Sequence, residues 1–166
     1  PAMLSVSDHP GLVEQLRTKW CSETMKTSEY ATFLEYCELV EYQQGDAIAD
    51  IGEVGESLYF VVEGEVALVT GSTASEVEVG RIHEGELMGE MSFFDRKPRQ
   101  VRLKAATPRD RLLKLTRPMY KRLRIEHPYI AVNLLEYAII SLDHLFRRAS
   151  EDVSNLNLYV FGSGKK

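Results

Sequence analysis

The sequence predicts an α+β chain that is mainly β, a jelly-roll-like β-roll with helices at both ends. Between residues 37 and 115, short apolar runs alternate with glycine-rich breaks, which is typical of closely spaced strands in a sandwich or jelly roll. On either side of this segment the apolar residues recur at helical spacing instead. We therefore expect one domain over residues 4–156, followed by a disordered tail over residues 157–166.

Length and composition indicate a globular domain. The chain has 166 residues, of which 44% are hydrophobic and 27% charged, so it can bury a core of ordinary size. We find no apolar run as long as a membrane span and no signal peptide, and we expect a cytoplasmic protein without membrane insertion. Two cysteines, Cys21 and Cys37, are expected to be reduced and largely buried. The net charge of −5 argues against direct nucleic-acid binding.

The N-terminal segment, residues 9–34, is predicted to be helical. Its apolar side chains recur at helical spacing, namely Leu12, Val13, Leu16 and Trp20. Ser28 is suited to cap a second short helix within this segment. Pro1 and Ala2 precede Met3 as a cloning remnant would, so we assign them no structural role.

The β-roll is predicted over residues 37–115. Seven runs have the length and alternation of strands: 37–43, 47–50, 58–63, 65–70, 76–82, 101–106 and 110–115. Glycine and polar residues separate them, and among these we interpret Gly55 and Gly64 as turn glycines.

Two C-terminal helices are predicted over residues 117–153. Thr116 is suited to cap the first, and the pair His127-Pro128 interrupts the pattern before a long helix over 129–153. This long helix has apolar residues on more than one face, and one stripe has coiled-coil spacing: Ala131, Leu135, Ala138, Leu142, Leu145 and Ala149. The roll can cover one face and a second copy of the chain the other, which predicts a homodimer. A single broad face buried within one chain is the alternative.

Five basic side chains lie between Arg96 and Lys104 in a chain that is otherwise acidic. A Gly89-Glu90 pair opens the preceding apolar stretch, and Pro98 and Arg99 close it. Backbone N–H groups at the start of a short helix and a guanidinium both favour a bound phosphate, while a nearby carboxylate can accept hydrogen bonds from a hydroxyl. A solvated basic surface is the alternative interpretation.

This segment and the glycine-punctuated stretch at 45–66 together resemble the cyclic nucleotide-binding domain family. The resemblance covers residues 9–153 and is to the sensor domain of catabolite-activator-like regulators, without their DNA-binding domain. It implies that Glu90 accepts the ribose 2′-hydroxyl and that Arg99 pairs with the cyclic phosphate. The ligand-binding set that it implies is Gly89, Glu90, Met91, Ser92, Arg99, Gln100 and Val101. A carboxylate that only stabilises a helix start and a surface ion pair are the structural alternatives for Glu90 and Arg99.

The sequence departs from the family pattern directly after the arginine. Small residues are expected there, whereas this chain has Gln100, Val101 and Arg102. The backbone N–H of Gln100 can still reach a phosphate, but its side chain could contact the base or crowd the pocket. Cyclic AMP is the expected ligand, with cyclic GMP possible. The alternatives are a dimerisation module of the same fold that binds no nucleotide, and a sensor fragment of a larger transcription regulator.

The base of a bound nucleotide needs a cover, and the long helix is the nearest candidate. Arg147 could stack on the base and Ser150 could hydrogen-bond its edge. Arg147 and Arg148 could instead only complement the helix dipole. Movement of this helix about His127-Pro128 would carry the signal to an effector protein that the sequence does not identify.

We expect no enzymatic activity, metal or cofactor. The four histidines are scattered and belong to no nucleophile or metal motif: His9, His83, His127 and His144. A metal-dependent cupin, another small jelly roll, is the main competing fold. It requires paired histidines, whereas here His83 alone precedes Glu84 and Glu86.

Overall fold

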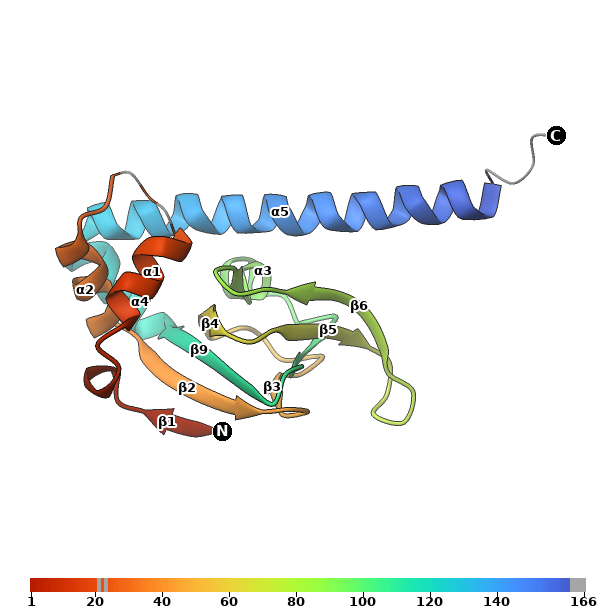
Figure 1. The fold of residues 1–166 in the computed structure, drawn as a ribbon, viewed down its shortest axis with the longest axis horizontal. Coiled ribbons are helices and arrows are strands. Elements are labelled where there is room, and N and C mark those ends of the chain that lie inside the picture. Colours follow the sequence, from red (N-terminus) through yellow and green to blue (C-terminus); the bar gives the residue numbers. More distant parts are fainter. Residues whose placement is uncertain (21, 23, 162–166) are drawn as a thin grey trace.

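The computed structural model describes residues 1–20, 22 and 24–161, and the side chains of these residues up to Ser154. Two antiparallel sheets form a roll beneath a long helix (Figure 1). The five-stranded sheet has the order β1 (Ala2–Leu4), β2 (Glu38–Gln43), β9 (Arg109–Thr116), β4 (Ser57–Glu63) and β7 (Leu87–Met88). The four-stranded sheet has the order β3 (Ala47–Ala49), β8 (Arg102–Ala105), β5 (Val66–Thr70) and β6 (Val77–Ile82). The predicted jelly-roll class is confirmed.

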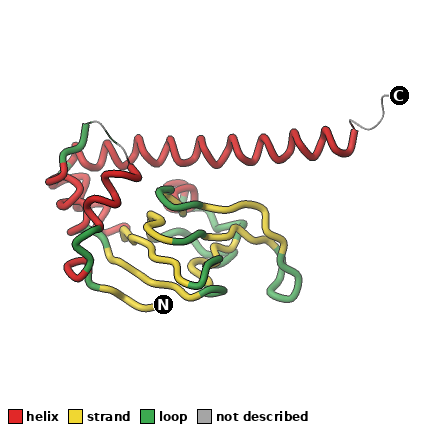
Figure 2. The backbone as a smooth tube through the Cα atoms, in the orientation of Figure 1, coloured by secondary structure: helices red, strands yellow, loops and turns green. Residues whose placement is uncertain are grey.

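Helices lie at one end of the roll and along one side of it (Figure 2). A 3-10 turn, η1 (Val6–Asp8), precedes α1 (Leu12–Trp20) and α2 (Thr27–Glu35). A single short helix, α3 (Glu90–Asp95), interrupts the strands. The chain then enters α4 (Arg117–Glu126) and α5 (Pro128–Phe161), which together carry the C-terminal part.

The seven predicted strands all occur within two residues of their expected bounds, but two strands were missed. β1 pairs Ala2 with Glu41, so assigning no structural role to Ala2 was wrong. β7 has only two residues, too few for any alternation to be visible in the sequence. Helix α2 begins at Thr27, one residue before the expected cap Ser28, whereas Thr116 does occupy the N-cap position of α4.

The long helix extends further than expected. We placed its end at Val153 and a disordered tail from residue 157, whereas α5 continues to Phe161. Residues 162–166 of that tail lie outside the described residues.

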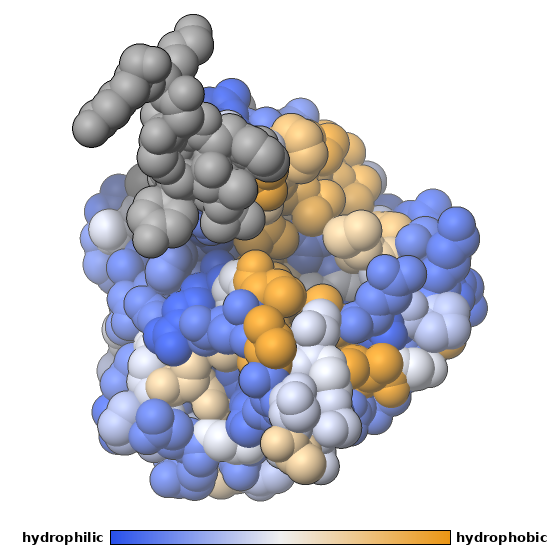
Figure 3. Space-filling view, turned by 90° about the vertical axis from the view of Figure 1, so that its right-hand side faces the viewer, coloured by the Kyte–Doolittle hydropathy of each residue, from blue (hydrophilic) through white to orange (hydrophobic). Residues whose placement is uncertain are grey.

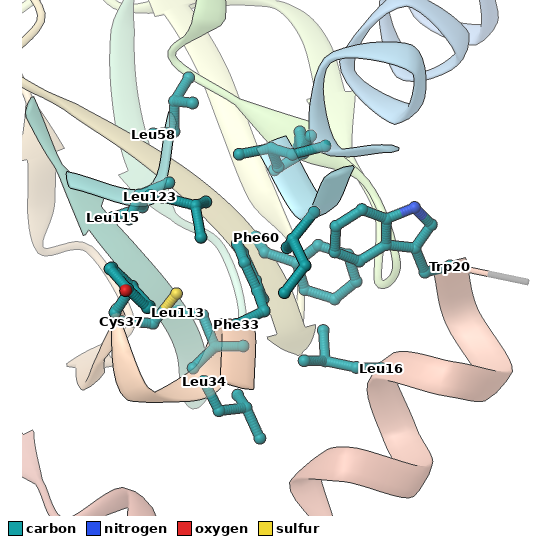
Figure 4. Close-up of a cluster of buried hydrophobic side chains, with 14 of the residues drawn as sticks. Leu16, Trp20, Phe33, Leu34, Cys37, Leu58, Phe60, Leu113, Leu115 and Leu123 are labelled. Carbon is teal, nitrogen blue, oxygen red and sulfur yellow. The ribbon is translucent and has the colours of Figure 1, made fainter. Parts of the chain in front are cut away.

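The larger of two hydrophobic clusters lies where α1, α2, α4 and the start of α5 meet the five-stranded sheet (Figure 4). Trp20 belongs to this cluster, with ring centroids 5.6 Å from Tyr30 and 5.3 Å from Phe33. Cys37 is a free, buried thiol in the same cluster, and burial raises its pKa. Cys21 lies outside the described residues. A second cluster, which includes Val61, fills the space between the sheets.

Two faces of α5 have different environments. The stripe predicted as a coiled-coil seam faces the protein's own core, because Ala131 and Ala138 are buried and Leu142 and Leu145 are partly buried. A second set of apolar residues, at intervals of seven, remains exposed: Val132 at 51%, Ile139 at 66%, Phe146 at 71% and Val153 at 58%. The stripe that we predicted as a dimer seam is thus covered by the protein's own roll, and the exposed apolar stripe lies about one residue away, a rotation of about 100° on a helix. The homodimer stays a prediction.

By length and composition, Pro128–Ser154 would suffice to cross a membrane, with a mean hydropathy of 1.2 in its most apolar stretch. We had found no apolar run of that length, because charged residues interrupt it. A core helix passes the same test, and 33% of that stretch is buried within the protein.

Candidate functional site

A pocket of about 330 Å³ lies between α3, the segment that follows it, the four-stranded sheet and α5. This volume is at the lower end of the range for small-molecule sites. Seen from the end of α5, hydrophobic residues gather beside the helix and across the middle of this face, with hydrophilic residues around them (Figure 3). All seven residues of the predicted ligand-binding set line the pocket: Gly89, Glu90, Met91, Ser92, Arg99, Gln100 and Val101.

Gly89 connects β7 to α3 in a conformation that favours glycine. Its φ is 85°, in the left-handed region, and it occupies the N-cap position of α3. A Cβ atom here would lie 3.1 Å from the carbonyl oxygen of Ser57 and 3.3 Å from Nη2 of Arg99. A side chain would therefore both strain the turn and press on the guanidinium.

Glu90, the first residue of α3, is a buried carboxyl group, only 5% exposed. Burial raises its pKa from 4.5 to about 7, and the charge of Glu86 adds to this effect, while Arg99 opposes it. A hydrogen bond from a ligand hydroxyl would stabilise the ionised form of such a buried carboxyl group.

The backbone of Arg99 is fixed by two hydrogen bonds, whereas the Nε atom of its guanidinium has no partner among the described residues. Its N–H donates to Glu53 C=O at 2.8 Å, and its C=O accepts from Gly52 N–H at 2.8 Å. Its Nε atom is buried and makes no hydrogen bond to any described residue. Burial also lowers the pKa of this guanidinium. An unpaired buried donor of this kind favours an anion.

Gly55 forms one wall beside Arg99. A Cβ atom at this position would lie 2.9 Å from Nη2 of Arg99 and 2.9 Å from the amide nitrogen of Phe93. Gly55 lies in no turn of the described structure, so the interpretation of Gly55 as a turn glycine was wrong, and its small size serves close packing instead. Gly64, with a φ of 91°, is a turn glycine as predicted.

Ser92 and Met91 line the pocket in different ways. The Ser92 hydroxyl accepts a hydrogen bond from Gly55 N–H at 2.7 Å and donates one to Lys97 C=O at 2.6 Å. It therefore ties the segment after α3 to the loop before β4. The side chain of Met91 is 67% exposed at the pocket rim.

Arg102, one of the three residues that depart from the family pattern, points away from the pocket. Its guanidinium donates to Asp50 at 2.8 Å and to Glu76 at 2.8 Å, and the residue is 9% exposed. Gln100 and Val101 do line the pocket. Only two of the three unusual residues can therefore contact a ligand there.

Helix α5 contributes Leu142 and Leu145 to the pocket, not the two residues that we expected to cap a base. Arg147 forms an ion pair with Asp143 at 3.1 Å, and its side chain is 72% exposed. Ser150 is exposed and is not among the pocket residues. In this arrangement the helix covers the pocket with apolar groups, and the expected capping residues Arg147 and Ser150 lie outside its lining.

The sequence-based reasoning missed the apolar wall of the pocket. This wall consists of Leu68, Ile82, Leu103, Leu142 and Leu145. Each residue fits the ordinary apolar pattern of its own strand or helix, so no local signal separates a ligand contact from a core residue. Among the described residues, no group of three or more His, Cys, Asp or Glu side chains could hold a metal ion.

Comparison with known proteins identifies the family to which this domain belongs. The sequence model of the cyclic nucleotide-binding domain matches residues 39–126, more than half of the chain. This chain belongs to the cyclic nucleotide-binding domain family. Strands β3 to β9 and the pocket segment around α3 lie within the matched range.

Two curated relatives are regulators. The chain is 30% identical over 88 residues to the cAMP-dependent protein kinase regulatory subunit of Mycosarcoma maydis, covering 53% of this chain and 17% of the relative. It is 28% identical over 128 residues to the cAMP-activated global transcriptional regulator CRP of Pasteurella multocida, covering 75% of this chain and 58% of the relative. The chain thus spans less than two thirds of either relative.

A crystal structure of a cyclic nucleotide-binding domain from Methylobacillus flagellatus has the same fold. Its TM-score is 0.79 at 19% identity, and the match covers 93% of this chain and 88% of the other. At this identity the likeness concerns the fold alone, and it includes nearly the whole described chain.

Proposed function

We propose that this domain binds a cyclic nucleotide, cyclic AMP foremost, in the pocket between α3 and α5. The observation that carries the proposal is the pair formed by Glu90 and Arg99, a buried carboxyl and a buried, unpaired guanidinium Nε in one pocket. A cyclic phosphate supplies the anion that Arg99 lacks, and a ribose 2′-hydroxyl supplies a donor for Glu90.

The apolar side chains that line the rest of the pocket fit a purine base. Leu68, Leu103 and Leu145 offer flat apolar contact without a fixed polar partner, and Gln100 is the one neutral amide nearby on the pocket wall. Such a wall favours a base by burial and discriminates little between adenine and guanine. Cyclic AMP is preferred here because both curated relatives carry cAMP in their names.

We further propose that nucleotide binding is read out through α5, with a second copy of the chain as partner. The exposed residues at seven-residue intervals give this helix a second apolar face beyond the one that covers the roll. Such a face predicts a parallel or antiparallel pair of α5 helices. We expect the protein to act in the cytoplasm on an effector protein, as a regulatory module without catalysis.

Isothermal titration calorimetry with cyclic AMP and cyclic GMP tests the binding proposal. We expect saturable heat with cyclic AMP at micromolar concentrations, and weaker or equal binding of cyclic GMP. The control ligand is 5′-AMP, whose phosphate is not cyclised. No heat with either cyclic nucleotide would contradict the proposal.

A dimerisation module that binds no nucleotide is the second candidate, favoured by the same exposed face of α5. Sedimentation of the parent protein and of Ile139→Glu with Phe146→Glu separates the two properties. Loss of dimers in this variant with unchanged calorimetry would show that binding and dimerisation are independent.

A further inference from the structure

Helix α5 is attached to the strand before α3 at two points. The Ser141 hydroxyl accepts a hydrogen bond from Leu87 N–H at 3.0 Å and donates one to Leu87 C=O at 3.2 Å. About two helical turns further on and on the same face, Nη2 of Arg148 donates to the Glu86 carboxylate at 2.9 Å and to Arg81 C=O at 3.0 Å. Both attachments join the helix to the segment that leads into Gly89.

These attachments lie on either side of the part of α5 that faces the pocket. Leu142 and Leu145, which line the pocket, lie between Ser141 and Arg148 along the helix. On the other side, Glu86 and Leu87 come shortly before Glu90 in the chain. A shift of the helix would therefore act on the start of α3 through the hydrogen bonds to Glu86 and Leu87 and the short segment that follows them.

The Glu86 carboxylate requires a counter-charge. The residue is 8% exposed, and its second oxygen accepts a hydrogen bond from His83 N–H at 2.9 Å. Its charge raises the pKa of Glu90, which makes the carboxylate form of Glu90 less favourable. Arg148 is the cation that pairs with Glu86. Removing it would leave a nearly buried charge unpaired beside the proposed ribose site.

We propose that Arg148 is a positioning residue of the nucleotide pocket: through Glu86 it holds α5 closed and keeps Glu90 available to the ribose. This inference rests on the proposed function and names the contact by which the helix senses an occupied pocket. Ser141 provides the second attachment, which fixes the helix along its axis. The neighbouring Arg147, paired only with exposed Asp143, has no such connection.

The test compares Arg148→Ala with Arg147→Ala as a matched control on the same helical turn. The rate at which radiolabelled cyclic AMP dissociates is measured after addition of excess unlabelled nucleotide. We expect Arg148→Ala to release the ligand about tenfold faster, because the nearly buried Glu86 carboxylate loses its partly exposed cationic partner. Arg147→Ala should stay within about twofold of the parent, because its ion pair is exposed.

Adding Glu86→Gln to Arg148→Ala distinguishes a charge effect from a loss of packing. The amide keeps an oxygen for His83 N–H but removes the unpaired charge. We expect this double variant to recover most of the lost residence time. Equal dissociation from Arg148→Ala and Arg147→Ala, or no recovery in the double variant, would overturn the proposal.

Hydrogen exchange of the nucleotide-free protein tests separately whether Arg148 attaches α5 to the segment before α3. Arg148→Ala should lose protection in residues 84–92 and 141–153 relative to Arg147→Ala. If the parent binds no cyclic nucleotide, the proposed function fails, while this loss of protection would still support the attachment. Unchanged protection in Arg148→Ala would overturn it whatever the binding result.

Discussion

The two ends of the pocket are built on different principles. At the end that we propose for the phosphate and sugar, Gly89, Glu90 and Arg99 come from one short stretch of chain. Backbone hydrogen bonds fix Arg99, and tight packing surrounds Gly89. At the base end, apolar side chains come from β5, β6, β8 and α5, and no hydrogen bond is needed to place them. Directional groups tolerate little displacement, whereas an apolar wall tolerates more.

This contrast assigns different tasks to the two ends. The polar end contains a carboxyl group with a raised pKa and an unpaired guanidinium Nε. Burying these groups without partners destabilises the ligand-free protein, so this end gains the most binding free energy from a ligand. The apolar end includes α5, the helix whose movement we propose as the readout of binding. We therefore expect affinity to depend mainly on the polar end and the response of α5 mainly on the base end.

Replacing Arg99 should have the largest effect. Arg99→Ala removes a charge-assisted, partly buried contact with the phosphate, and we expect cyclic AMP binding to weaken on the order of a hundredfold. Calorimetry measures this change, and thermal unfolding should move little. Arg96→Ala, at an exposed position of the same segment, is the control and should affect binding mainly at low salt. Equal affinities of Arg99→Ala and the parent would remove the polar end from the account.

The strain at the polar end should appear as a pH dependence of stability. Because burial raises the folded-state pKa of Glu90 from 4.5 to about 7, its stabilising contribution is full below pH 4.5 and is lost as the pH rises through 7. Glu90→Gln should lose this dependence and gain on the order of 2 kcal/mol over the parent between pH 5 and 8. Urea denaturation across this range measures the difference. Parallel curves for the two proteins would mean that Glu90 is not strained.

The sugar hydroxyl should be recognised by Glu90. We expect 2′-deoxy cyclic AMP to bind about tenfold more weakly than cyclic AMP, since the buried carboxylate then lacks its donor. Glu90→Ala should weaken binding of both ligands and erase most of this preference. Competition titrations with the two nucleotides provide the comparison, and equal binding of both by the parent would refute this role.

The base end should show the smallest effect on affinity. Leu145→Ala removes part of an apolar wall and should weaken cyclic AMP binding about threefold to fivefold. His144→Ala, an exposed neighbour on α5, serves as the control and should leave binding unchanged. A loss at Leu145 as large as that at Arg99 would reverse the ranking of the two ends.

The same contrast explains what could be predicted from the sequence. The strands, their breaks and the polar end follow from local patterns, because Gly89, Glu90 and Arg99 are close together in the chain. The two-residue strand β7 and the pairing of Ala2 depend on partners far away in the sequence. Gly55 was misinterpreted for a similar reason, because its size matters only beside Arg99.

The base end could not be predicted because it depends on the rotation of α5. The helix carries apolar residues on two faces, and a choice between them requires knowledge of which one meets the roll. In the structure, Leu142, Leu145 and Arg148 face the roll. Arg147 and Ser150, which we expected to face the pocket, are exposed instead. Periodicity alone identifies an apolar face but not its partner.

Hydrogen exchange with and without cyclic AMP tests the central claim most directly, because it observes both ends of the pocket in one experiment. If the nucleotide bridges Arg99 and the leucines of α5, protection should increase both in residues 88–104 and in the helix over 129–153, most strongly around Leu142 and Leu145. Arg99→Ala should abolish both changes together. Protection confined to residues 88–104 would contradict closure of the helix over the base, and no protection at saturating nucleotide would contradict the account as a whole.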